Sequence, residues 1–315
     1  MIKIIYFGTP EFSRIILEKI YSKVEILAVI TQPDKPKGRG KKVLPPPVKE
    51  FALDKNIPVL QPEKLRENWE IIDIIRKLSP DALIVAAYGK IIPEEILNIP
   101  PFGGINIHAS ILPKYRGAAP IERAIMNCEK ETGVSIIKME KELDAGPVYA
   151  IEKIEILPED DRGSLSFKLA NLGADLLLKV LPLIKEGAIE PIPQDDSQAT
   201  YAPKLSKEEE IIDWQNSGLR IWCQIRALAP EPGAITTFRG KNLKVFKARF
   251  EGEVFERDII NGTIIKLDKE KGIGVKVKDG ILWVLELQPE SKRRMNFLEF
   301  LNGYRLNIGE KFTSF

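Results

Sequence analysis

The sequence has few of the residues that usually bind metals or form cross-links. Its 315 residues include one histidine and two cysteines. Zinc sites usually take three or four nitrogen or sulfur ligands, so we predict no metal. Two cysteines are too few for a disulfide framework, which favours a reducing, cytoplasmic location.

Long apolar runs are also lacking. No run approaches the ~18–20 residues that a membrane span requires, and the chain opens on a strand-like pattern rather than a signal peptide. We therefore expect no membrane partner. The composition is nevertheless 44% hydrophobic, enough for buried cores, and the length favours about two domains.

Net charge is nearly absent, but the charges are unevenly distributed. The 47 basic and 45 acidic residues give +2. Residues 33–49 carry six basic residues and one acidic residue, a net +5, and residues 214–250 carry seven and one, a net +6. The remainder is therefore acidic, at −9. Two basic segments on an acidic body indicate a directed electrostatic footprint, with solvated faces as the alternative.

The first half of the chain alternates strand-like and helix-like segments. Continuously apolar strands between amphipathic helices predict an α/β domain with a parallel sheet covered on both faces, over residues 1–188. Its first helix is expected to begin with Thr9 as N-cap and Pro10 at the first position. The expected strands are 2–7, 24–31, 81–87, 104–108, 134–139 and 148–156.

The second half has a different texture. Residues 189–205 contain three prolines and no apolar periodicity, which predicts an inter-domain linker. Residues 206–315 begin with a short helix and continue as short strands punctuated by glycine, which predicts a small β-barrel.

A polar pair at the end of one predicted strand carries the strongest chemical signal. Asn106 and His108 are two residues apart, so their side chains share one face of the strand. Ligands of open α/β sheets bind at the carboxyl ends of the strands. An amide can stabilise a developing oxyanion and an imidazole can accept a proton, which together suit acyl transfer to an amine.

The imidazole needs a partner that orients it, and Asp144 is the candidate. It lies in a glycine-containing turn just before a predicted strand. An aspartate that merely caps its own turn is the alternative.

The first strand is not followed by G-x-G-x-x-G, which disfavours an NAD-linked dehydrogenase. A non-catalytic RNA-binding protein would leave the polar residues without a role.

With these residues in view, the chain resembles the methionyl-tRNA formyltransferase family over nearly its whole length. Residues 106–117 read Asn-Ile-His-Ala-Ser-Ile-Leu-Pro-Lys-Tyr-Arg-Gly, a block shared by the wider folate-dependent formyltransferases. The Gln-Pro-Asp…Gly-Arg-Gly-Lys-Lys loop at 32–42 and the C-terminal domain narrow the resemblance to the tRNA enzymes. Ala109 and Ile111 stand where glycine and leucine are expected, and neither change removes a catalytic group.

The resemblance implies a Rossmann-like first domain and an OB-like C-terminal barrel, a fold that commonly binds oligonucleotides. It implies that an enzyme of this kind transfers a formyl group from 10-formyltetrahydrofolate to methionine on initiator tRNA, for translation initiation. It implies a catalytic trio of Asn106, His108 and Asp144, in which Asp144 either orients the imidazole or relays a proton to the leaving nitrogen. It also implies a folate side made of Ser110, Ile111, Leu112, Pro113, Ala87, Tyr88 and Gly89, and a tRNA contact made of Lys37, Arg39, Lys41 and Lys42.

Another folate-dependent formyltransferase, acting on glycinamide ribonucleotide or a nucleotide sugar, is the alternative. The basic loop and the C-terminal domain argue against it.

We further expect a monomer, and a basic loop at 33–49 that is mobile until tRNA binds. Cys128 and Cys223 lack an acid–base setting and are expected to be small buried residues. Trp214, Trp222 and Phe238 are expected to be core residues rather than platforms for bases.

Overall fold

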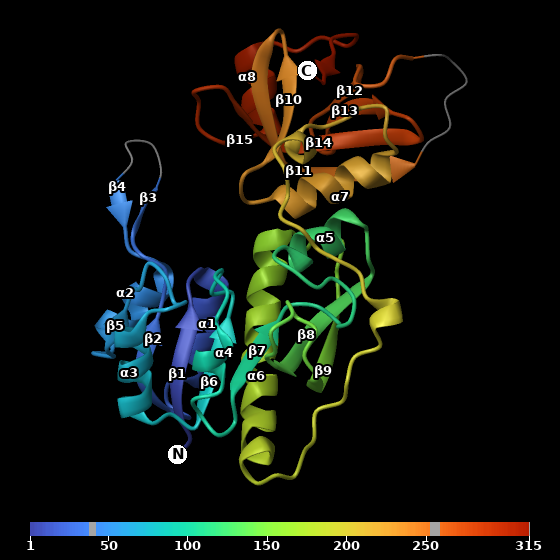
Figure 1. Cartoon of the computed structure of the whole chain (residues 1–315). Helices are drawn as coiled ribbons and strands as arrows, with labels where there is room; N and C mark the ends of the chain where they lie inside the picture. The colour runs from blue at the N-terminus through green and yellow to red at the C-terminus, as the bar shows by residue number, and fades with distance from the viewer. Residues whose placement is uncertain (38–41, 253–258, 315) are drawn as a thin grey trace. The chain divides into compact units, whose positions relative to one another are not determined.

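The structure is a computed structural model that describes residues 1–37, 42–252 and 259–314 (Figure 1). The chain divides into two compact units. The first unit comprises residues 1–120, 131–155 and 166–203, and the second comprises 121–130, 156–165 and 204–315. These units differ from the domains expected at 1–188, 189–205 and 206–315. Two short segments of the first half pack within the second unit, and most of the expected linker packs within the first.

A seven-stranded sheet forms the centre of the first unit, in the order β5-β2-β1-β6-β7-β8-β9. The strands from β5 to β7 are parallel, as expected, whereas β8 runs antiparallel to β7 and β9 antiparallel to β8. The α/β, Rossmann-like prediction is confirmed, with an antiparallel edge that the sequence did not predict. The strands are β1 (Lys3–Gly8), β2 (Glu25–Ile30), β5 (Val59–Leu60), β6 (Ala82–Ala86), β7 (Gly104–His108), β8 (Glu131–Lys138) and β9 (Val148–Glu155).

Helices pack on the sheet and show which way the side chains at the end of β7 point. Ile71, Ile72 and Ile75 of α3 share one apolar core with side chains of β1 and β6. Helix α6 packs closely on β7, because a Cβ at Gly173 would lie 2.7 Å from Ile107 Cγ2. Since side chains alternate along a strand, Asn106 and His108 point away from α6. The helices of this half are α1 (Glu11–Ile20), α2 (Pro47–Asp54), α3 (Trp69–Leu78), α4 (Glu94–Leu97), α5 (Pro120–Met126) and α6 (Arg162–Lys185).

The first turn of the sheet corrects one expectation. Pro10, not Thr9, is the N-cap of α1, and no side chain caps this helix. Thr9 Oγ1 instead donates to the Tyr88 carbonyl oxygen, 3.0 Å away. Gly8 is required for packing, because a Cβ there would lie 1.7 Å from Ser13 Oγ. Thr9 therefore ties the loop after β1 to the loop after β6 and does not cap the helix.

The second unit contains an antiparallel sheet in the order β12-β13-β14-β11-β10-β16. The two ends of this order also meet. The Phe312 N–H of β16 donates to the Gly262 carbonyl oxygen, and the Ile264 N–H of β12 donates to the Glu310 carbonyl oxygen, so hydrogen bonds close the sheet. The OB-like prediction is confirmed. The elements are η2 (Glu208–Glu210), α7 (Gly218–Leu228), β10 (Ala234–Phe238), β11 (Lys241–Gly252), β12 (Ile264–Asp268), β13 (Gly272–Val277), β14 (Gly280–Pro289), β15 (Met295–Asn296), α8 (Phe297–Tyr304) and β16 (Phe312–Thr313).

Aromatic residues of this unit belong to its core, as expected. Trp214 and Phe238 are buried, and Trp214 Nε1 donates to Thr236 Oγ1 over 3.0 Å. Trp222 is partly buried against the same core and donates to the Ala248 carbonyl oxygen. None of these three rings is presented as a platform for a base.

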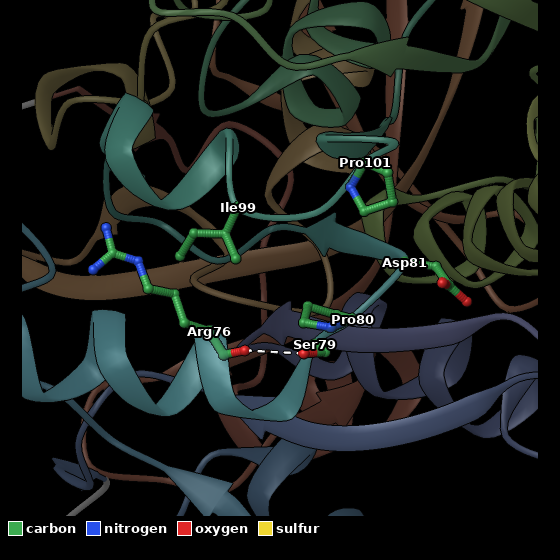
Figure 2. Close-up of a pocket in the computed structure, with 6 residues that line it drawn as sticks. All are labelled: Arg76, Ser79, Pro80, Asp81, Ile99 and Pro101. Carbon is green, nitrogen blue, oxygen red and sulfur yellow. Dashed lines mark hydrogen bonds between the residues drawn. The ribbon is translucent and has the colours of Figure 1, made fainter.

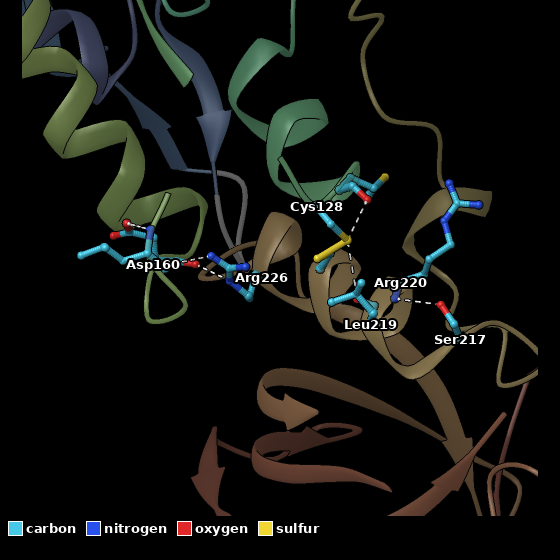
Figure 3. The surroundings of a disulfide bond; sticks show 9 residues. Cys128, Asp160, Ser217, Leu219, Arg220 and Arg226 are labelled. Carbon is cyan, nitrogen blue, oxygen red and sulfur yellow. Dashed lines mark hydrogen bonds between the residues drawn. A yellow bond between two sulfur atoms is a disulfide. The ribbon is translucent and has the colours of Figure 1, made fainter. Parts of the chain in front are cut away.

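The two cysteines correct a further expectation. Cys128 and Cys223 form a disulfide, with Cα atoms 5.7 Å apart and 95 residues between them in sequence (Figure 3). The pair forms because residues 121–130 pack in the second unit beside α7, which sequence distance conceals. The same part of the unit is held by Arg226, which donates to the carbonyl oxygens of Asp160 and Leu157. The cysteine count therefore no longer supports a reducing compartment.

Candidate active site

The carboxyl ends of the parallel strands form one edge, and the loops that follow them are tied together. The Tyr88 carbonyl oxygen, just after β6, accepts from Thr9 Oγ1 after β1 and from Gln32 Nε2 after β2. The two bonds are 3.0 and 2.8 Å long. Gln32 was not singled out in the sequence, although it begins the Gln-Pro-Asp motif. This edge is the place where open α/β sheets bind ligands.

The structure brings the three candidate catalytic side chains together at this edge. Asn106 Nδ2 donates to Asp144 Oδ1 over 3.2 Å. His108 Nδ1 lies 3.5 Å from Asp144 Oδ2. The His108 and Asp144 side chains are only 6% and 9% exposed, so water screens this contact weakly.

Asp144 is fixed from a further side. Its Oδ2 accepts the backbone N–H of Gly117 over 2.9 Å. Asp144 itself adopts a left-handed backbone conformation, with φ of 52°. Aspartate is one of the few residues with a side chain that tolerate that region comparatively well. The carboxylate is thus held by groups from two other segments and does not merely cap its own turn.

The second ring nitrogen of His108 is also engaged. Nε2 lies 2.9 Å from the carbonyl oxygen of Tyr115, which only accepts hydrogen bonds. Both ring nitrogens therefore face oxygen atoms. An attacking amine that delivers its proton to Nε2 has to displace the Tyr115 carbonyl.

The loop after β7 was predicted to line the folate side, and its side chains divide into two groups. Ser110 and Leu112 are buried. Ser110 Oγ donates to the Lys114 carbonyl, and its own carbonyl accepts from Ser135 Oγ, each over 2.7 Å. Ile111 and Pro113 are half-buried and remain accessible to a ligand. Ser110 therefore shapes the loop, and its hydroxyl is already bonded to protein.

The loop after β6 exposes backbone rather than large side chains. Ala87 and Gly89 are exposed, and both have positive φ, 46° and 81°. A Cβ at Gly89 would lie 2.5 Å from Gln32 Nε2. Tyr88 between them is buried against Phe7, with ring centroids 5.3 Å apart. Burial raises the pKa of Tyr88 to about 12.

Two short strands of the basic segment at 33–49 pair with each other as a hairpin around residues 38–41, which lie outside the described residues. β3 (Lys35–Lys37) pairs antiparallel with β4 (Lys42–Leu44). Asp34 anchors its base, because its carboxylate accepts from Lys49 Nζ and Gln61 Nε2 over 2.7 Å each. These hydrogen bonds, Gln61 first, lower the pKa of Asp34. Of the predicted tRNA contacts, Arg39 and Lys41 lie outside the described residues, and only the backbone is described for Lys37 and Lys42.

The described residues contain no metal cluster, and the pocket drawn in Figure 2 lies away from the catalytic candidates. Within the described residues, no group of three or more His, Cys, Asp and Glu could hold a metal ion. No helix in the described ranges is long and apolar enough to cross a membrane.

The pocket in Figure 2 lies before β6 begins, at the opposite end of that strand from Tyr88. Its lining residues are Arg76, Ser79, Pro80, Asp81, Ile99 and Pro101.

Comparison with known structures shows the same fold in proteins that bind folates. HypX from Aquifex aeolicus, solved in complex with tetrahydrofolic acid, has a TM-score of 0.64 at 17% identity, covering 98% of this chain and 48% of that one. An N-formyltransferase from Helicobacter canadensis, complexed with folinic acid and dTDP-3-aminofucose, has a TM-score of 0.63 at 21% identity, covering 94% and 100%. At these identities the likeness shows the fold alone.

Comparison of sequences is more specific. The formyl transferase family matches residues 2–181, and the formyl transferase C-terminal domain matches 204–305. The methionyl-tRNA formyltransferase of Dictyoglomus thermophilum is 74% identical over 310 residues, covering 98% of this chain and 99% of the relative. That of Dictyoglomus turgidum is 72% identical over 312 residues, covering 99% of each. The chain therefore belongs to the methionyl-tRNA formyltransferase family.

Proposed function

We propose that this enzyme transfers the formyl group of 10-formyltetrahydrofolate to the α-amine of methionine on initiator tRNA. The observation that carries the proposal is the cluster of Asn106, His108 and Asp144, joined by contacts of 3.2 and 3.5 Å at the carboxyl edge of the sheet. The chain's family supplies the acceptor, because the relatives above are named for methionyl-tRNA.

Asn106 is placed to stabilise charge on the formyl oxygen. Its side-chain amide has two N–H donors, and one of them is used by Asp144. The second can donate to the formyl oxygen as negative charge develops there. The contact with Asp144 fixes the plane of the amide before substrate arrives, so little reorganisation is needed during the reaction.

His108 acts as the general base in this proposal. A free α-amine has a pKa of roughly 7.7–8, and only its neutral form attacks. The amine becomes acidic once it has attacked, and an imidazole can accept its proton near neutral pH. His108 is buried at the end of β7, so the proton passes to a group shielded from bulk water.

Asp144 orients His108 and stabilises its protonated form. The backbone N–H of Gly117 and the Asn106 amide hold the carboxylate in place. A group fixed in this way suits orientation better than a proton relay to the leaving nitrogen, which would require the carboxylate to release a donor. We therefore prefer the first of the two roles.

The neighbouring loops suit the two substrates. The exposed backbone at Ala87 and Gly89 and the half-buried side chains of Ile111 and Pro113 offer surface for a flat pterin ring. The basic hairpin, with Lys37, Arg39, Lys41 and Lys42, is assigned to the acceptor stem, where phosphates attract positive charge. We propose that the enzyme works as a monomer in the cytoplasm and without a metal, the folate being a co-substrate.

An acceptor panel tests the proposal. The enzyme is given labelled formyl donor and methionyl-tRNA, uncharged tRNA, free methionine, glycinamide ribonucleotide or an amino-sugar nucleotide. Transfer to methionyl-tRNA alone is expected. Faster transfer to glycinamide ribonucleotide or to the sugar would replace the proposal by the alternative.

A further inference from the structure

One segment outside the family motifs reaches the catalytic cluster. Residues 189–203 lack regular structure apart from η1 (Asp196–Gln198), yet they bond closely to the first unit. Val148 and Ile192 exchange backbone hydrogen bonds of 2.8 Å. Ala202 and Thr200 bond to the backbone of Arg116 over 2.7 and 2.8 Å. This stretch is therefore part of the site's framework and not only a connection.

Gln194 is the side chain of this segment that reaches the turn carrying Asp144. Its Nε2 donates to the carbonyl oxygens of Asp144, over 2.8 Å, and Gly146, over 2.7 Å. Its Oε1 accepts from Arg116 Nη2 over 2.8 Å and from Arg116 Nε over 3.1 Å. Only this amide orientation satisfies all four contacts, since carbonyls accept and guanidinium groups donate.

Arg116 is built into the structure as the support for Gln194. It is 4% exposed, and Nη2 also donates to Asp196 Oδ1 over 2.7 Å. A buried guanidinium needs partners for its charge and its donors, and Gln194 and Asp196 supply them. The residue after it, Gly117, donates to Asp144 Oδ2. Arg116 is thus bonded to Gln194 through its side chain and to Gly117 through the chain, and both of these residues hold the Asp144 turn.

Asn106 and Gly117 hold the side chain of Asp144, whereas Gln194 bonds to the backbone of the turn. Leu143 beside it is 68% exposed, and Asp144 has positive φ. Gly146 fits closely, since a Cβ there would lie 1.8 Å from the Lys138 carbonyl oxygen. The two N–H donors of Gln194 bind the carbonyl oxygens of Asp144 and Gly146 and so hold the two residues together. We propose that Gln194 is a positioning residue that fixes Asp144 against His108, an inference that rests on the proposed function.

Two substitutions separate positioning from folding. Gln194→Glu keeps the acceptors for Arg116 but loses the N–H donors to the turn, and Gln194→Ala removes both. Gln198→Ala is the matched control, because Gln198 is exposed in the same segment and its side-chain amide donates to Asp195 rather than to the Asp144 turn. We expect kcat to fall about 10- to 100-fold in both Gln194 variants, as for a catalytic group displaced by about 1 Å, with both KM values and the Gln198→Ala enzyme unchanged.

The single histidine gives a readout that needs no substrate. Its Cε1–H resonance is the only one of its kind in the chain and reports the position of Asp144. We expect this resonance to move in both Gln194 variants and to stay in place in Gln198→Ala. An unmoved resonance overturns the inference, whatever happens to kcat, and so does a wild-type kcat. If wild type fails to formylate methionyl-tRNA, the proposed function falls, while the resonance still decides the positioning role.

Discussion

Asn106 Nδ2 donates to Asp144 Oδ1 over 3.2 Å, so a strand residue and a turn residue 38 positions apart share one hydrogen bond. That bond links the donor proposed for the formyl oxygen to the carboxylate that faces His108. Charge stabilisation and proton acceptance are thereby coupled through Asp144. Disturbing this carboxylate is expected to impair both.

Asp144→Asn removes the charge and leaves the side chain nearly the same size. The amide cannot accept from both Gly117 N and Asn106 Nδ2 as the carboxylate does. We expect kcat to fall roughly 10²–10⁴-fold, as when a base loses its orienting carboxylate, with little change in either KM. Rapid-quench kinetics give the rate. Asp175→Asn, which removes an exposed carboxylate paired with Lys19, is the control and should behave as wild type. Equal rates in the two variants would remove Asp144 from the mechanism.

Gly89→Ala tests the folate side of the site. The new Cβ would meet Gln32 Nε2 at 2.5 Å and break its bond to the Tyr88 carbonyl. We expect KM for the folate to rise about tenfold or more, since 1.4 kcal/mol of lost binding is a factor of ten. Gly187→Ala introduces the same left-handed strain, but nothing lies within 4 Å of its Cβ. A similar rise in the folate KM of Gly187→Ala would show that strain alone is responsible.

Tyr88→Phe tests a buried hydroxyl. Tyr88 Oη is buried without a hydrogen-bond partner among the described residues, so its removal should leave stability at pH 8 unchanged or slightly higher. Burial raises the pKa of Tyr88 to about 12. Above pH 10 the unfolded chain therefore ionises first, and wild type loses stability as the pH approaches 12. Urea unfolding at pH 8 and pH 11 should show the advantage of Tyr88→Phe growing with pH. A constant difference would contradict this.

Arg39→Ala tests the assignment of the basic hairpin. Arg39 lies outside the described residues, between strands whose base is anchored by Asp34 and Lys49. We expect KM for methionyl-tRNA to rise about tenfold, because a phosphate contact is lost, and the folate KM to stay unchanged. Lys55→Ala, an exposed residue paired with Asp54, controls for net charge. If both variants raise the tRNA KM equally, the effect is one of overall charge.

The sequence predicted what depends on local pattern. Alternation along a strand predicts that Asn106 and His108 share one face. Apolar patterns of neighbouring residues likewise predict the buried strands of the first unit and the core placement of Trp214. The pairing of Cys128 with Cys223 and the reach of Gln194 to Asp144 are contacts between distant segments, and no local pattern encodes them. The β3–β4 hairpin was missed because proline, glycine and lysine dominate its composition, which is typical of loops.

The single-turnover rate of formyl transfer to methionyl-tRNA, in wild type and in His108→Ala, tests the central claim most directly. The account predicts rapid transfer by wild type and a rate ~10²–10⁴-fold lower in the variant, typical of the loss of a general base. The variant should bind the folate normally, because the loops assigned to the pterin are intact. No second histidine exists to take over the role. A near wild-type rate in His108→Ala, or no transfer by wild type, would contradict the account.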